Sequence, residues 1–185
     1  MKNPYAIGSK VYLRAPTLED AEGNWYKWFS DPEITKYLSD RYLPNSKEDQ
    51  IKFFNSLETS KDKIVLSICR IDNDEHIGVC GLSLINWFHR NADISYVIGE
   101  KKLNNTTVIT EVMKLLLDVS FNRLNIENLR STYAGSNHIT PIIDKIYGFK
   151  LVGKLEKYII IQGNRDDLIM SQLTKKDWQF RNKVG

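Results

Sequence analysis

Residues 98–118, "IGEKKLNNTTVITEVMKLLLD", join the end of a strand to the start of a helix. The strand-like segment stops at Gly99, a polar loop follows, and apolar residues then recur at helical spacings. Where a loop leads from a strand into a helix, free backbone N–H groups and the helix dipole converge on one point and favour an anion. The segment therefore predicts a phosphate-binding turn. Such turns usually contain glycine so that the backbone can approach the ligand closely, and none follows Gly99 before the helix.

The segments on both sides of this stretch read as strands. Residues 92–99 ("ADISYVIG") precede the helix and residues 128–134 ("NLRSTYA") follow it. A strand–helix–strand unit in one sheet requires a right-handed crossover and parallel pairing of its two strands. Upstream, residues 63–71 and 76–87 are separated by the polar turn "NDEH" and lead into residues 92–99 through "FHRN". These three strands predict an antiparallel meander, so the expected sheet is mixed and mostly antiparallel.

Two helices are expected between a first strand at residues 10–16 and this meander. Thr17 is the expected N-cap of the first, and Ser46 that of the second, because each is followed three residues later by an aspartate. One face of the first helix is expected to be buried, and it carries Leu18, Ala21, Trp25, Trp28 and Phe29.

Near the C-terminus, Thr140 is the expected N-cap of a short helix that stops at Gly148. Two closing strands follow around the turn "QGNR". The elements predict one α+β (mixed α/β) domain over residues 1–185, with a central mixed sheet of about seven strands flanked by about four helices.

Composition excludes several classes of function. The net charge of +3 is small and its basic residues are dispersed, whereas nucleic-acid binding needs a clustered basic face. No apolar run approaches the length of about 18 residues that a membrane span requires, and the N-terminus lacks the apolar core of a signal peptide. Cys69 and Cys80 lie in strand-like segments and are expected to be buried reduced thiols of a cytoplasmic protein. Neither cysteine has a metal-ligand motif beside it, so no metal is expected.

The order of these elements, with several local phrases, resembles the GNAT superfamily of N-acetyltransferases. Within it, the chain is similar to the branch of ribosomal-protein alanine acetyltransferases and spermidine acetyltransferases. The phrases are "VYLRAPTLEDAE", "WFSDPEITKYL", "HIGVCGLSLINWFHRNADISYVIGEKK", "TEVMKLLLDVSFNRLNIENLRS", "SNHITPIIDKIYGFKLVG" and "GNRDDLIMSQLTKKDW". They cover nearly the whole chain. The resemblance implies a GNAT-like fold and acetyl-CoA as co-substrate.

In that family a loop of the form Arg/Gln-x-x-Gly-x-Gly/Ala holds the pyrophosphate of acetyl-CoA through backbone amides. The resemblance places Asn104, Thr107 and Ile109 at the three signature positions, and all three depart from the pattern. Thr107 and Ile109 are expected to present bulk to the pyrophosphate, which leaves weak binding or no binding open. The cofactor residues that the resemblance implies in this loop are Asn104, Asn105, Thr106, Thr107, Val108, Ile109 and Thr110.

Two further cofactor contacts follow from the resemblance. In the family the fourth strand offers free backbone groups to the pantetheine arm, and Tyr96, Val97 and Ile98 occupy that strand end here; they are equally compatible with a purely structural role. Asn137 matches an asparagine that commonly opens the last helix near the cofactor. A capping or turn role ahead of Thr140 is about as well supported for Asn137.

Acetyl transfer to an amine needs a proton acceptor for the amine and a proton donor for the leaving thiolate. The resemblance makes Asp93 the candidate base, acting through water because its side chain is short; an ordinary strand-edge aspartate is an equal alternative. The family's usual acid is a tyrosine in the last helix, and Asp144 stands at its position. Asp144 is expected to be a helix-surface residue. Tyr147 lies three residues further on, so it is expected to be displaced from that tyrosine's place.

Family acceptors lie between the first two helices and the fourth strand. The resemblance therefore makes Trp28, Trp87, His89 and Arg90 the candidate acceptor-binding residues, with aromatic rings able to hold an amine through cation–π contacts. The alternatives are structural: Trp28 is buried in a helix face, and the "FHRN" turn is exposed to solvent. These alternatives are the better supported ones.

The sequence supports two functional hypotheses. The first is an acetyl-CoA-dependent N-acetyltransferase that acts on a small amine, an amino sugar or a protein N-terminus by direct attack in a ternary complex. The second is a catalytically impaired GNAT-fold module for binding or assembly. Loss of the loop glycines and of the helix tyrosine favours the second, whereas the complete fold pattern, Asp93 and Asn137 favour the first, which we adopt. Neither hypothesis involves nucleic acid or a membrane, and a homodimer is left open.

Overall fold

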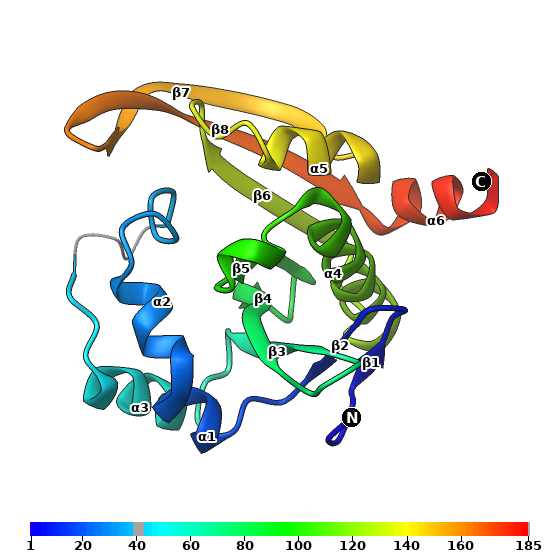
Figure 1. Ribbon diagram of the computed structural model, residues 1–185. Coiled ribbons are helices and arrows are strands. Elements are labelled where there is room, and N and C mark those ends of the chain that lie inside the picture. The colour runs from blue at the N-terminus through cyan, green and yellow to red at the C-terminus, as the bar shows by residue number, and fades with distance from the viewer. Residues whose placement is uncertain (39–42, 185) are drawn as a thin grey trace.

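The computed structural model describes residues 1–38 and 43–184, with side chains through Arg181. One sheet of eight strands runs through it in the order β1-β2-β3-β4-β5-β6-β8-β7 (Figure 1). The strands are β1 (Ala6–Ile7), β2 (Val11–Arg14), β3 (Ile64–Arg70), β4 (His76–Asn86), β5 (Asn91–Ile98), β6 (Asn128–Ala134), β7 (Lys150–Ile161) and β8 (Asn164–Thr174). The helices are α1 (Leu18–Asp20), α2 (Tyr26–Ser30), α3 (Lys47–Ser56), α4 (Thr106–Asp118), α5 (Thr140–Tyr147) and α6 (Lys175–Val184). The predicted mixed α/β fold is confirmed, although β1 and α6 were not predicted.

The middle of the sheet holds its one parallel pair within the described residues. β3, β4 and β5 form the predicted antiparallel meander, and β5 pairs with β6 in parallel, as the crossover through α4 requires. Only the first three residues of β5 pair with β6, the last pair being Asp93 with Arg130. Beyond that pair the two strands part, and Figure 1 shows β6 turning away from β5 together with β8, β7 and α5.

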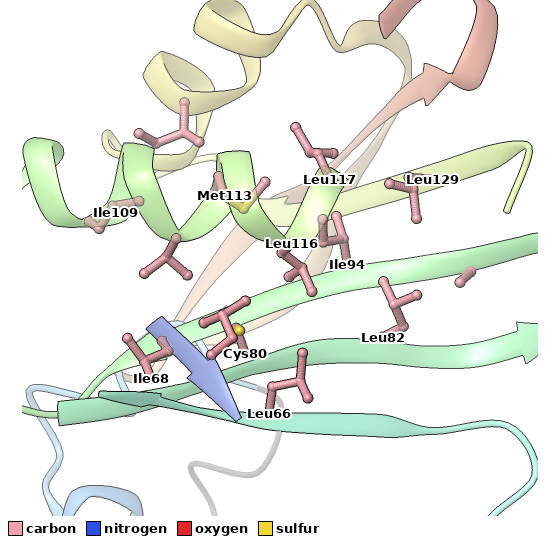
Figure 2. Packing of buried hydrophobic residues seen from close by; sticks show 14 of the residues in the cluster. Leu66, Ile68, Cys80, Leu82, Ile94, Ile109, Met113, Leu116, Leu117 and Leu129 are labelled. Atoms are coloured by element: carbon pink, nitrogen blue, oxygen red, sulfur yellow. The ribbon is translucent and has the colours of Figure 1, made fainter. Parts of the chain in front are cut away.

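The larger hydrophobic core lies between α4 and the sheet. Figure 2 shows side chains from α4 pointing towards side chains from the strands beneath it. The labelled helix residues are Ile109, Met113, Leu116 and Leu117, and the labelled strand residues are Leu66, Ile68, Cys80, Leu82, Ile94 and Leu129. Cys69 and Cys80 are both buried free thiols, as predicted. The apolar stripe read from the sequence is therefore the face of α4 that covers the sheet.

A second, smaller core covers the opposite face of the sheet. It consists of Ala21, Trp25, Trp28 and Val79, with side chains of α3 packed around them. Because side chains alternate along a strand, Ala92 and Ile94 of β5 face α4, whereas Val97 faces the tryptophans. The helices α1 to α3 and the helix α4 therefore lie on opposite faces of the sheet.

Two details of the expected helices were wrong. The first helix is not continuous, because a π-helical turn, Ala21–Trp25, with non-helical dihedrals at Gly23 separates α1 from α2. Leu18 consequently points away from the core and is 48% exposed. Thr140 is not the N-cap of α5 but its first residue, and the side-chain oxygen of Asn137 accepts from the backbone N–H groups of Ile139 (3.0 Å) and Thr140 (3.2 Å). Gly148 ends α5 in the left-handed region, as predicted.

Candidate active site

The N-terminus of α4 offers free donors at the predicted phosphate-binding turn. Asn105 is the N-cap, and its side chain accepts from the Val108 N–H at 3.2 Å. The first main-chain bond of the helix joins the Ile109 N–H to the Asn105 carbonyl at 3.1 Å. The N–H groups of Thr106 and Thr107 occupy the first two helical positions, which have no partner within a helix. These two donors and the helix dipole face outwards and are free to bind an anion.

The side chains of this turn divide into two groups. Asn104, Asn105, Thr106 and Thr107 are exposed, whereas Val108 and Ile109 are buried beneath α4. Ile109 is 1% exposed and belongs to the larger core. The expectation that Ile109 presents bulk to a pyrophosphate was therefore wrong, because its side chain points to the sheet. Thr110 is half-buried within the first turns of α4.

Close packing behind the turn explains the one glycine that precedes it. A Cβ at Gly99 would lie 1.9 Å from the ring of Trp28, so any other residue would displace that ring. Trp28 is only 4% exposed and also stacks edge-on against His76. Trp28 was predicted to bind the acceptor, but the structure gives it a packing position under the turn. In the same region Lys101 pairs with Asp31 at 2.7 Å, and this hydrogen bond holds the pKa of Asp31 below its ordinary value.

The three predicted pantetheine residues lie on the part of β5 that has left β6. Ile98 is buried in the larger core, Val97 packs against the tryptophans, and Tyr96 lies partly buried on the side of α4 and α5. Their backbone groups facing β6 have no strand partner there, because pairing with β6 ends at Asp93. This edge is where a linear polar chain can add its own hydrogen bonds, as a strand would.

Asp93 lies at the joint where β5 and β6 part, and Arg130 of β6 holds it. The guanidinium donates to both carboxylate oxygens, each at 2.8 Å, and the pair raises the pKa of Arg130. Both residues line a groove of about 510 Å³ on the face of the sheet away from α4, together with residues of β4, β7 and β8. Arg130 was not among the predicted site residues. The parallel pairing of these two strands, which was expected from the sequence, could have indicated Arg130, because it brings the segments that carry Asp93 and Arg130 together.

The remaining predicted acceptor residues lie in the β4–β5 turn and do not line this groove. The Trp87 indole donates to the Lys61 carbonyl at 2.6 Å, and Arg90 pairs with Glu127 at 3.3 Å. His89 is exposed and its ring lies against that of Phe88. The structure thus places Trp87, His89 and Arg90 apart from Trp28, and their contact with an acceptor stays a prediction.

Asp144 is buried, so its expected position on the helix surface was wrong. It is 5% exposed, and the Ser171 hydroxyl donates to its carboxylate. Burial raises the pKa of Asp144, and the hydrogen bonds from Ser171 and Ser131 offset part of that effect. Tyr147, three residues later on α5, donates its hydroxyl to the Thr110 carbonyl of α4. Asp144 therefore interacts with β6 and β8, and Tyr147 with α4.

Comparison with known proteins agrees with this arrangement. A family model described as "Acetyltransferase (GNAT) domain" matches residues 10–142. An uncharacterized N-acetyltransferase, p20, from Bacillus licheniformis is 29% identical over 173 residues, which are 91% of this chain and 95% of that protein.

Solved structures show the same fold. A spermidine N-acetyltransferase from Vibrio cholerae, solved with CoA and spermine, superposes with a TM-score of 0.84 at 20% identity, covering 93% of this chain and 99% of that one. A probable acetyltransferase of the GNAT family from Chromobacterium violaceum gives a TM-score of 0.77 at 19% identity, covering 94% and 87%. With the family model spanning most of the chain, this protein belongs to the GNAT acetyltransferase family and is an N-acetyltransferase.

Proposed function

We propose that this protein transfers the acetyl group of acetyl-CoA to a primary amine by direct attack of the amine in a ternary complex. The observation that carries the proposal is the parting of β5 from β6 after Asp93 and Arg130. At one end of that parting stands the free N-terminus of α4, and on the other face of the sheet lies the groove around Asp93. An acyl donor and an acceptor can thus reach one point from opposite sides.

The residues present fit acetyl-CoA without the family's loop glycines. The N–H groups of Thr106 and Thr107 would receive the pyrophosphate beside the exposed side chains of these two residues, and Ile109 would not obstruct it because it is buried. The unpaired edge of β5 at Tyr96 to Ile98 receives the pantetheine arm. Asn137 caps α5 through its oxygen, which leaves its amide N–H groups for the ligand. When bound, acetyl-CoA supplies an acetyl group activated as a thioester.

Asp93 is the proposed proton acceptor. Arg130 occupies one lone pair on each of its oxygens, and a carboxylate has about four such sites, so water or an ammonium group can still bond to it. Arg130 also fixes the direction of the carboxylate towards the groove. The acceptor is proposed to be a small amine, an amino sugar or a protein N-terminus, and the spermidine acetyltransferase of similar fold supports the first of these.

The test is an acetylation assay with acetyl-CoA and a panel of spermidine, glucosamine, an alanine-initiated peptide and no amine. Thiol release that depends on one of the amines, with the acetylated product seen by mass spectrometry, is the expected result. Asp93→Asn should lower kcat by about 100-fold or more, which is typical for loss of a general base, while the affinity for acetyl-CoA stays within twofold. Arg130→Gln is the comparison variant: it keeps the carboxylate and removes only the guanidinium that positions it, so kcat should fall less than in Asp93→Asn. Binding of acetyl-CoA with no product from any amine would instead favour the binding or assembly module.

A further inference from the structure

The side of β5 that faces α5 carries a tyrosine beside the unpaired edge of the strand. Tyr96 lies three residues beyond Asp93, on the part of β5 that no longer pairs with β6. Its ring packs partly against the larger core, and Thr140, the first residue of α5, and Asp144 of the same helix both influence the pKa of its hydroxyl. The phenol therefore faces α5.

The two acidic groups of α5 are engaged elsewhere. Asp144 accepts from Ser171 of β8, and Tyr147 donates to the Thr110 carbonyl of α4. A second tyrosine, Tyr133, reaches the same side of the sheet from β6, but Tyr96 is the one on the strand that is proposed to hold the pantetheine arm.

We propose that Tyr96 is the catalytic acid of this enzyme and that its phenolic O–H serves the sulfur of the leaving CoA. This inference rests on the proposed function. As the amine nitrogen bonds to the acetyl carbon, the carbon–sulfur bond breaks and its electron pair remains on sulfur. Tyr96 donates its proton to that sulfur and regains one from solvent. The proton that the amine nitrogen loses passes to Asp93 or to water, so the reaction consumes no net proton.

The surroundings of Tyr96 keep its phenol protonated at neutral pH. Burial raises the pKa of Tyr96 to about 12, and the negative charge of Asp144 adds to this effect while the side chain of Thr140 opposes it. A phenol in this state is a hydrogen-bond donor at neutral pH and an unfavourable place for a standing negative charge. It therefore returns to the neutral form after each transfer.

The first test titrates bound CoA and needs no turnover. The thiol of CoA bound to the parent protein is titrated against pH by its thiolate absorbance, and the same is done with Tyr96→Phe and Tyr133→Phe. A donor beside the sulfur favours the thiolate, so the thiol pKa should be about one unit lower in the parent and in Tyr133→Phe than in Tyr96→Phe. Equal thiol pKa values in the parent and in Tyr96→Phe would overturn the proposal.

Kinetics provide the second readout. Tyr96→Phe should lower kcat by about 100-fold with the KM for acetyl-CoA within twofold of the parent, and Tyr133→Phe should leave both unchanged. Melting temperatures check that both variants fold, since each loses only a hydroxyl. A parent that does not bind CoA at all would overturn the proposed function itself, whereas a parent that binds and turns over with no deficit in Tyr96→Phe would overturn only the role of this residue.

Discussion

At the scale of single residues, the most demanding position is Asp20, a carboxylate buried between β2, β3 and the first helix. Arg14 donates to both of its oxygens at 2.6 and 2.7 Å, Ser67 donates at 2.8 Å, and the Thr17 N–H donates at 2.9 Å. Burial alone would raise the pKa of Asp20, but these bonds, led by Arg14, hold it at about 2. A charge this deep is stabilised only because nearly all of its lone pairs are occupied.

His76 lies beside this carboxylate and makes the protein sensitive to acid. Its Nδ1 is 3.3 Å from Asp20, yet burial lowers the pKa of His76 to about 4, so the ring is neutral at pH 7. In the unfolded chain His76 takes up a proton near pH 6.5, whereas in the folded chain it does so only near pH 4. The free energy of unfolding therefore keeps its full value above pH 6.5 and falls as the pH is lowered towards 4. The loss by pH 4.5 should be on the order of 2–3 kcal/mol.

Urea unfolding of the parent and of His76→Gln between pH 7 and 4.5 measures this loss. The variant should have a flatter profile, because glutamine keeps a donor towards Asp20 and takes up no proton. The window lies above the ordinary aspartate pKa of 3.8, at which Asp20 would begin to take up protons in the unfolded chain, so titration of that group contributes little. Parallel profiles for the two proteins would show that His76 does not cause the acid sensitivity.

At the scale of elements, the first turn of α4 contains both exposed residues and residues of the hydrophobic core. Exposed threonines at its start face solvent, and Val108 and Ile109 immediately after them face the sheet. The helical period was readable from the sequence, but which loop residue faces a ligand was not. Alignment with a family motif assigned Ile109 to a position of the phosphate-binding loop. The direction of its side chain depends on where α4 begins relative to the sheet.

Ile109→Ala should therefore behave as a core substitution. We expect it to lower the free energy of unfolding by about 2–5 kcal/mol, through loss of buried methyl groups and the cavity that remains. Thr107→Ala, two residues earlier and exposed, should change it by less than about 0.5 kcal/mol. Chemical denaturation of both variants measures the difference, and equal stabilities would place Ile109 outside the core.

Asp144 shows the same limit within α5. Its position in a short helix before Gly148 was predicted and is confirmed, and its side chain was expected on the surface of that helix. The structure instead buries it against two serines, from β6 and β8. Only tertiary pairing brings Ser131 and Ser171 to that point, since they are 40 residues apart in the chain, so local pattern could not reveal the partners that make its burial tolerable.

At the scale of the whole molecule, the sheet consists of two parts that share a short joint. Three residue pairs hold β5 to β6, and beyond them β6, β8 and β7 continue without β5. The antiparallel meander and the parallel pair were predicted from the sequence, because short turns and crossover handedness leave few alternatives, whereas the order β6-β8-β7 was not predicted. The depth of the parting, and the ion pair of Asp93 with Arg130 at its base, depend on how α4 and α5 pack, which periodicity does not encode.

The phosphates of acetyl-CoA are proposed to bind main-chain N–H groups at the start of α4, and one substitution removes such a group without removing any other donor that its control keeps. Thr106→Pro removes the N–H group of the first helical position, where proline is well tolerated, and the extended dihedrals of Asn105 suit a following proline. Thr106→Ala loses the same hydroxyl but keeps the N–H. Calorimetric titration of both variants with acetyl-CoA should show binding about 10- to 100-fold weaker for Thr106→Pro, the worth of one hydrogen bond to a charged group, at closely similar melting temperatures. Equal dissociation constants for the two variants would contradict a cradle at this helix terminus.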